Sequence, residues 1–286
     1  MGYSWIRLIR PIQRIPLLVV LAVAGCAAAP GCAVAGEVVN DAPRPSLDVP
    51  HAAVKPKMDG SPTDPAWDAA AKIPQFSVSV GDNTKGLTAL PTEVRVLWDD
   101  ANLYVRFICT DSEIYSPHTG RDASHYEGDV AEIFFDPKGD QRQYFELQVS
   151  PNNQVLDQNI LVTGEPKFTP ALTFDWGFTG KDVWYDLAYT MQGFTTATGR
   201  FEKDAKPAGW IADAAIPATA SLKRLGTAKF APDMQMRINF IRYDWALRAE
   251  DGADGKRKLI AMNWAPVLFG CPHVSPAAMG QIKLAK

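Results

Sequence analysis

The chain has 286 residues, of which 47% are hydrophobic and 21% charged, with a formal net charge of −3 at pH 7. This balance is ordinary for a globular protein, and a chain of this length can bury a sizeable core. The chain has no basic run or patch, which argues against nucleic acid as a partner. The G-x-S-x-G, H-E-x-x-H and phosphate-binding glycine-loop motifs are also absent, which excludes the enzyme classes that depend on them.

The N-terminus has the pattern of an export signal. Arg7, Arg10 and Arg14 make a positive region before the apolar run IPLLVVLAVAG. This run is too short for a comfortable membrane span. It ends in VAGC, which resembles a bacterial lipobox in which Cys26 is acylated, and a competing A-x-A cleavage site ends at Ala35. We therefore expect an exported protein, a periplasmic or cell-surface lipoprotein, or a secreted one if cleavage follows Ala35.

Composition divides the chain into three parts. Residues 1–25 are the expected signal peptide, and residues 26–53 are rich in Ala, Pro, Gly and Val, which is typical of a lipidated or flexible linker. Residues 54–286 are expected to form one domain.

Short alternating runs separated by turn residues fill this domain. The expected strands are Thr92 to Trp98, Leu103 to Thr110, Val130 to Asp136, Tyr144 to Ser150, Val183 to Thr190, Trp210 to Ile216, Met236 to Tyr243 and Leu259 to Trp264. Two short helices, DPAWDAA and PATASLKRL, each have a proline near the start. The pattern predicts an all-β fold, a single β-sandwich that is jelly-roll-like with immunoglobulin-like layers.

Two of the expected strands form a hairpin that contains two glutamates. If the hairpin turns near Gly139, Glu132 lies directly opposite Glu146 on the face away from the core. Like charges so placed are destabilising unless something compensates them. The candidates are an arginine, a metal ion or the hydroxyl groups of a ligand.

Each form of compensation implies a different role for the pair. Arg95, Arg106 or Arg142 would make the pair part of a solvated charge ladder. Facing carboxylates could also approach the separation of about 5–5.5 Å found in retaining glycoside hydrolases. A glycoside hydrolase that uses both glutamates is therefore an alternative to a binding site.

The cysteines of the expected domain allow two interpretations. Cys109 and Cys271 could form a disulfide in an oxidising compartment. Alternatively, Cys109 is a buried free thiol.

The order of short motifs along residues 54 to 284 resembles carbohydrate-binding module family 9 and its family-9-like relatives. The motifs are MDG at 58–60, DPAW at 64–67, VLWDD at 96–100, GDVAEIFFD at 128–136, WIADAAIP at 210–217, RINF at 237–240, and NWAP at 263–266 with HVSP at 273–276 and Gly280. The resemblance implies a non-catalytic β-sandwich that binds sugars or polysaccharide ends in a catabolic or cell-surface context. A separate glycoside hydrolase is the partner it suggests.

The resemblance also implies site residues. Tyr126 and His273 match the positions of two aromatic side chains that grip a terminal sugar, although imidazole offers less stacking area than phenol. Glu132 matches the family's hydroxyl-binding acid. The residues expected to supply further polar contacts are Glu146, Asn239 and Arg242.

The resemblance suggests two candidate cofactors. Family members often hold structural Ca²⁺, and Asp136 and Asp140 are weak candidates because Lys138 stands where another acid would help. A remote alternative is haem, since related sandwiches include cytochrome-like domains, and His273 lies near Met279 in the sequence.

Overall fold

The computed structural model describes residues 44–78, 88–162, 183–247, 257–267, 272–274 and 276–286. The signal peptide, Cys26 and Cys271 lie outside the described residues. Among the described helices, none is both long and apolar enough to cross a membrane.

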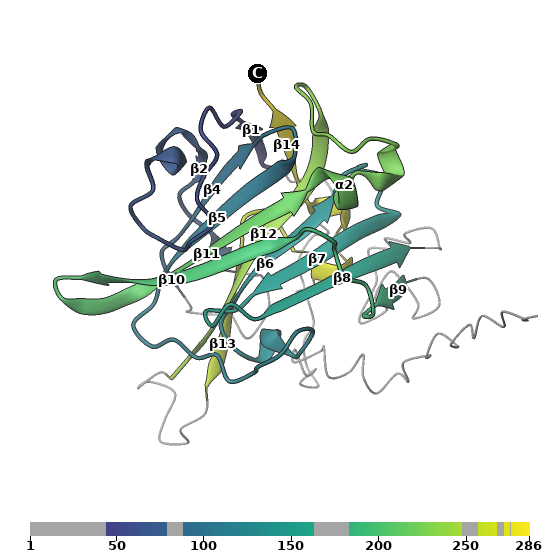
Figure 1. Ribbon diagram of the computed structural model, residues 1–286. Coiled ribbons are helices and arrows are strands. Elements are labelled where there is room, and N and C mark those ends of the chain that lie inside the picture. Colours follow the sequence, from purple (N-terminus) through teal and green to yellow (C-terminus); the bar gives the residue numbers. More distant parts are fainter. Residues whose placement is uncertain (1–43, 79–87, 163–182, 248–256, 268–271, 275) are drawn as a thin grey trace, which may run out of the picture. The chain divides into compact units, whose positions relative to one another are not determined.

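The larger sheet has nine strands (Figure 1). Seven follow the order β1-β14-β12-β6-β7-β8-β9, and β13 and β3 continue from β12. Their bounds are β1 Ser46–Val49, β3 Ser77–Val78, β6 Val130–Asp136, β7 Gln143–Val149, β8 Val155–Val162, β9 Val183–Asp186, β12 Gln235–Ala246, β13 Lys258–Asn263 and β14 Gly280–Leu284. The β1–β14 pair is parallel.

The smaller sheet has five antiparallel strands in the order β10-β11-β5-β4-β2. They are β2 Ala71–Ile73, β4 Thr92–Trp98, β5 Asn102–Thr110, β10 Thr195–Lys203 and β11 Lys206–Pro217. Helical segments are short: α2 (Ala218–Ser221) and the 3₁₀ turns η1 (Pro65–Ala69), η3 (His125–Glu127), η4 (Lys223–Leu225), η7 (Pro272–Val274) and η8 (Pro276–Ala278).

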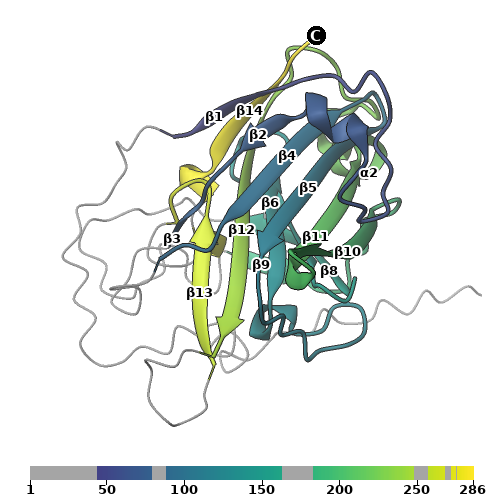
Figure 2. The same ribbon diagram turned by 90° about the vertical axis from the view of Figure 1, so that its left-hand side faces the viewer.

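The two sheets pack around one apolar core (Figure 2). Alternate residues of β5, namely Leu103, Val105, Phe107 and Cys109, meet Ile133 and Phe135 of β6 and further residues of β12 in this cluster. The predicted β-sandwich is confirmed.

Most predicted strands are present within a residue or two, but six strands were not predicted. These are β1, β2, β3, β8, β10 and β14. β1 falls in the segment expected to be a linker, so the sheet begins at Ser46, before residue 54. The expected helices are shorter than proposed, because DPAWDAA forms the 3₁₀ turn η1 and PATASLKRL divides into α2 and η4.

The MDG motif has a structural role. Gly60 has φ +68°, and a Cβ there would lie 2.4 Å from the backbone of Gly199. Only glycine permits both the backbone conformation and this close approach. The Gly60 N–H donates to Asp213 Oδ2 at 2.9 Å, which anchors the segment on the smaller sheet.

A buried ion pair completes that anchor. Arg106 Nε lies 2.6 Å from Asp213 Oδ1, with Nη2 2.8 Å from Oδ2, and the guanidinium lies 4.7 Å from the centre of the Trp67 ring. Burial raises the pKa of Asp213 even though Arg106 acts to lower it. The burial of the acid therefore outweighs the attraction of its partner.

This pair gives a testable stability prediction. Arg106→Met leaves Asp213 buried without its cation and should lower the free energy of unfolding by about 3–5 kcal/mol. The double variant Arg106→Met/Asp213→Asn should recover most of the loss, because asparagine keeps an acceptor for Gly60. Lys229→Met, which breaks the exposed pair with Asp100 (3.4 Å), should barely move the melting temperature. Urea unfolding measures the free energy for the first two variants and a thermal melt measures the third. An Arg106→Met variant as stable as wild type would contradict this account.

Candidate functional site

The β6–β7 hairpin buries both of its faces. Ile133, Phe135, Phe145 and Leu147 point into the core between the sheets, as predicted. Glu132, Phe134, Tyr144, Glu146 and Gln148 are also buried. Phe134 and Tyr144 belong to a second apolar cluster with Val267 and Met279, which come from the chain after β13. The hairpin face away from the core is therefore covered rather than solvated.

The predicted register of the hairpin is wrong by two residues. Glu132 pairs with Gln148, and Phe134 pairs with Glu146. The turn is centred one residue later than expected, because Asp136 accepts hydrogen bonds from the N–H groups of Gly139 and Gln141, both at 2.8 Å. A shift of two residues preserves the face but changes the partner. The glutamates thus share a face as diagonal neighbours and do not lie directly opposite each other.

One amide joins the two glutamates. Gln148 Nε2 donates to Glu132 Oε1 at 2.8 Å and to Glu146 Oε1 at 2.7 Å. Gln158, opposite Glu146 on β8, donates its Nε2 hydrogen to Glu146 Oε2. Two carboxylates and two amides therefore form a continuous polar row across β6, β7 and β8.

His273 closes one end of this row. Its Nε2 lies 2.8 Å from Glu146 Oε2, and its backbone carbonyl accepts a hydrogen bond from the Tyr144 hydroxyl. The ring makes edge contacts with Phe134 (5.2 Å between centroids) and Tyr185 (5.5 Å). His273 thus lies beside Glu146, although its expected stacking on a sugar stays a prediction.

Three buried oxygens in the row receive no hydrogen bond from the described residues. They are Glu132 Oε2, Gln148 Oε1 and Gln158 Oε1. A buried acceptor without a partner is costly, on the order of 1–3 kcal/mol. Three of them on one sheet face make this row a candidate site for a ligand that donates hydrogen bonds.

The two glutamates have opposite electrostatic environments. Burial, followed by the charge of Glu146, raises the pKa of Glu132 well above its ordinary value. Burial acts in the same direction on Glu146, but the charge and hydrogen bond of His273, with the amides of Gln158 and Gln148, outweigh it and lower its pKa. Glu146 is therefore the preferred site of negative charge, and Glu132 is the preferred site of a proton.

Asn239 lies near this row but has a structural contact. Its amide donates to the Ala265 carbonyl at 3.1 Å and accepts from the Ala265 N–H at 2.9 Å. It therefore holds the chain that follows β13 against the outer face of the sheet.

Arg242 was assigned to the wrong face. Three residues separate it from Asn239, so the alternation of β12 points the two side chains to opposite sides. Arg242 points between the sheets, where its guanidinium donates to Thr92 Oγ1 (3.1 Å), the Thr110 carbonyl (2.8 Å) and Asp244 Oδ2 (2.8 Å). It cannot share a polar surface with Glu132 and Glu146.

Two of the arginines proposed to compensate the glutamates lie in the other sheet. Arg106 is bound to Asp213, and Arg95 pairs with Glu93 and Asp68. Arg142 lies at the hairpin turn, where its N–H donates to Asp140 Oδ1 at 3.0 Å. Compensation comes from His273 and amide donors.

Tyr126 lies in η3 before the hairpin and is half-buried. Its carbonyl accepts a hydrogen bond from Trp245 Nε1 at 2.9 Å, which fixes the backbone of this turn to β12. Its expected stacking role stays a prediction.

The turn acids are engaged by the protein. Asp136 accepts two backbone hydrogen bonds, and Asp140 contacts Lys138 Nζ (3.1 Å) and Arg224 Nη2 (3.0 Å). Two cations on Asp140 disfavour a third there, so the weak Ca²⁺ candidates at this turn gain no support.

Cys109 and Met279 are both apolar-core residues. Cys109 is a buried free thiol, as one of the two interpretations predicted, and burial raises its pKa to about 12. Met279 packs in the apolar cluster over the outer face, and the His273 Nε2 atom lies against Glu146. Neither arrangement supports the haem alternative.

Sequence reasoning missed Gln148, Gln158 and Tyr185 as site residues. Strand alternation places Gln148 on the same face as Glu146, but nothing in the sequence assigns it a role. Gln158 and Tyr185 could have been found only by recognising β8 and aligning it with β7 and β9.

The charge assignments predict opposite effects of two isosteric substitutions. Glu146 has a lowered pKa, so its contribution to stability is present above its ordinary pKa of 4.5 and is lost as pH falls. Glu146→Gln should therefore lower stability near neutral pH by about 1–3 kcal/mol. Glu132 has a raised pKa, so the penalty for ionising it grows as pH rises above 4.5. Glu132→Gln should raise stability by a few tenths to about 1 kcal/mol at neutral pH.

Thermal melts of both variants at about pH 4 and about pH 8 measure these effects. Both differences from wild type should shrink at the lower pH. Equal destabilisation by the two substitutions would show that the glutamates are equivalent structural acids.

Comparisons with known proteins identify the family and the fold. Residues 58–285 match the family model described as carbohydrate family 9 binding domain-like. A 92-residue segment is 38% identical to endo-1,4-beta-xylanase A of Thermotoga neapolitana, covering 32% of this chain and 8% of the xylanase.

Two solved structures share the fold. A family 9 carbohydrate-binding module of Caldicellulosiruptor kristjanssonii in complex with cellotriose has a TM-score of 0.53 and 19% identity, over 84% of this chain and 94% of the module. A module of this family from the same organism, in complex with glucose, gives a TM-score of 0.50 and 18% identity, over 84% and 96%. Because the family model spans most of the sequence, this chain belongs to the carbohydrate family 9 binding domain-like family.

Proposed function

We propose that this protein binds the terminal sugar of a carbohydrate chain at the row formed by Glu132, Gln148, Glu146 and Gln158. The observation that carries the proposal is the set of three buried oxygens without hydrogen-bond partners on that row. Sugar hydroxyls are donors of suitable size and spacing to satisfy adjacent acceptors on a sheet face. The family assignment and the two neighbours with bound cellotriose and glucose support this choice of ligand.

The degree of enclosure favours a chain end over a long open chain. Glu132 is 1%, Glu146 2% and Gln158 6% exposed, so a ligand that reaches them must be surrounded by protein. The end of a glycan can enter such a site, whereas an internal segment would need an opening at both sides.

Within this proposal the residues have separate tasks. Sugar hydroxyls donate to Gln148, to Gln158 and to the ionised form of Glu132, and these donors would lower the raised pKa that Glu132 has in the free protein. His273 keeps Glu146 ionised and oriented through its 2.8 Å contact. Tyr126 is proposed as the stacking platform, as the family resemblance implies. A separate glycoside hydrolase would supply catalysis, consistent with the occurrence of a similar segment in a xylanase.

Export and lipid anchoring are further parts of the proposal. Cys26 would be acylated and hold the domain at a membrane surface, which would keep the binding site near extracytoplasmic glycans. The lipobox-like VAGC after the apolar run supports this assignment.

The binding site can be tested by calorimetric titration with glucose and cellotriose. Glu132→Gln replaces an acceptor by an NH₂ donor without changing the shape, so it should weaken binding by about 1.5–3 kcal/mol, or roughly tenfold or more. The matched control is Glu93→Gln on β4 of the other sheet, which should bind like wild type.

Three results would count against the site or the function. Equal affinity of wild type and Glu132→Gln would show that the site lies elsewhere. A wild-type protein that binds neither probe nor any sugar on a glycan array would contradict sugar binding itself. Release of reducing sugar that disappears in Glu132→Gln would replace the binder by a hydrolase.

The anchor is tested by metabolic labelling with a radioactive fatty acid in a bacterial host. Wild-type protein should carry the label and fractionate with membranes, whereas Cys26→Ser should lose the label because no thioether can form. Cys32→Ser is the matched control and should stay labelled. Label retained in Cys26→Ser would exclude this lipidation site.

A further inference from the structure

A cavity lies at one end of the sandwich, on the opposite side of the nine-stranded sheet from the proposed sugar row. It has a volume of about 280 Å³, and it forms where the end of β5 and the start of β11 meet the end of β12. Asp244, which lines it, follows Arg242 by two residues on β12 and therefore points to the inner side of this sheet. The volume is close to the lower end of the range for small-molecule sites, so the cavity suits a small ligand.

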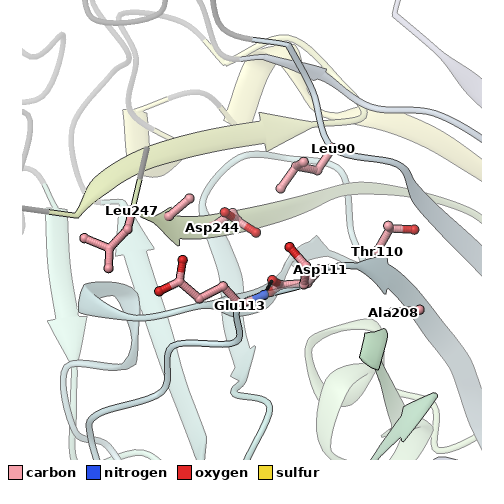
Figure 3. A pocket seen from close by; sticks show the side chains of 9 residues that line it. Leu90, Thr110, Asp111, Glu113, Ala208, Asp244 and Leu247 are labelled. Atoms are coloured by element: carbon pink, nitrogen blue, oxygen red, sulfur yellow. Dashed lines mark hydrogen bonds between the residues drawn. The ribbon is translucent and has the colours of Figure 1, made fainter. Parts of the chain in front are cut away.

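The side chains that line the cavity carry acidic, hydroxyl or apolar groups. Figure 3 shows the carboxyl groups of Asp111, Glu113 and Asp244 around the hollow. Leu90 and Leu247 are the largest of the apolar side chains in the lining. None of the described residues that line the cavity has a basic or amide side chain. The cavity therefore favours a ligand group that donates hydrogen bonds and carries a positive charge.

Two of the three carboxylates already hold an arginine. Arg242 Nη2 donates to Asp244 Oδ2 at 2.8 Å, and Arg257 Nη2 donates to Glu113 Oε1 at 2.8 Å. Asp244 and Glu113 are therefore engaged by the protein itself. The third carboxylate, that of Asp111, is the one that can receive a ligand.

Asp111 has one oxygen without a hydrogen bond. Its Oδ1 accepts the Glu113 N–H at 2.7 Å, whereas Oδ2 is buried and has no hydrogen-bond partner among the described residues. Arg242 Nη2 lies 3.6 Å from Oδ2, and it donates instead to Asp244 and to the Thr110 carbonyl. Asp111 is only 6% exposed, so bulk water contributes little to its solvation. A carboxylate oxygen in this position is stabilised when a ligand in the cavity donates to it.

We propose that the cavity binds a small organic ligand through a primary ammonium group placed on Asp111 Oδ2. An ammonium group has three donors and no acceptor, which matches a lining whose charged groups are all carboxylates. Its hydrogen bond to a carboxylate is charge-assisted and roughly twice as strong as a neutral one. The apolar part of the ligand would pack against Leu90 and Leu247.

Two other donor groups fit the cavity less well. A guanidinium is a planar fork that pairs best with both oxygens of a carboxylate, and Asp111 Oδ1 already accepts the Glu113 N–H. A neutral hydroxyl would place its own lone pairs beside three carboxylates. The ammonium site is independent of the proposed sugar row, because it lies on the other side of the sheet and uses none of the residues of that row.

The test is an NMR titration of the full chain with butylammonium, in phosphate buffer with a chelator so that no buffer amine or metal ion competes. Butylammonium should shift the backbone amide signals of Ser112 and Glu113 in a saturable way, with millimolar affinity. Butanol, which replaces the ammonium by a hydroxyl, should need a concentration about tenfold higher or more. Neither probe is a sugar, so the outcome does not depend on the sugar row.

One substitution and a matched control locate the site. Asp111→Asn keeps the shape of the side chain and removes its charge, so it should raise the half-saturating butylammonium concentration about tenfold or more. Asp233→Asn is the control, because this exposed acid pairs with Lys283 before the start of β12, whereas the cavity lies at the end of β12. The control variant should bind like wild type.

The comparison of the two probes on wild type decides the question if Asp111→Asn fails to fold. Wild type whose Ser112 and Glu113 signals do not move at tens of millimolar butylammonium would overturn the proposal. Equal affinity for butylammonium and butanol would overturn it, and so would an unchanged butylammonium affinity in folded Asp111→Asn.

Discussion

The polar row on the outer face of the large sheet depends on one amide nitrogen, Gln148 Nε2. This atom donates hydrogen bonds to the carboxylates of both Glu132 and Glu146. Two buried acids so close are unfavourable unless they differ in protonation or gain partners. His273 and the donating amides make Glu146 the charged member, whereas Glu132 is shifted toward its neutral form. The row that holds this pair also contains three buried oxygens without hydrogen-bond partners among the described residues, and we propose that the row recognises a sugar.

The alternation of side chains along β12 places different polar groups on the two faces of the large sheet. On β12, Asn239 points outward and holds the chain after β13, whereas Arg242 points between the sheets toward Asp111 and Asp244. The large sheet thus carries a polar row on one side and a charged group at the margin of the core on the other. The Trp245 indole donates to the Tyr126 carbonyl. The turn that carries the proposed stacking residue is therefore attached to β12 next to Asp244, a member of the charged group.

Sequence patterns predicted the fold class because alternating strands such as Thr92–Trp98 are strongly periodic. They missed β8, whose apolar positions are mixed with buried polar residues such as Asp157 and Gln158. They also missed β14, an alternating run of only five residues, Gly280–Leu284. The site was predicted in part. The predicted face of Glu132 and Glu146 is correct, because a register shift of two residues does not change the face. The predicted cross-strand partners are wrong, because the pairing depends on how the Asp136 carboxylate closes the turn. The spacing of Asn239 and Arg242 already implied opposite faces, whereas the contact of His273 with Glu146 joins residues 127 positions apart and has no local signal.

A structure of the protein determined with bound cellotriose tests the central claim most directly. The account predicts sugar hydroxyl oxygens within hydrogen-bond distance of Glu132 Oε2, Gln148 Oε1 and Gln158 Oε1, the three acceptors that have no partner among the described residues. A sugar bound on the five-stranded sheet, or one that touches Tyr126 but none of these oxygens, would contradict it.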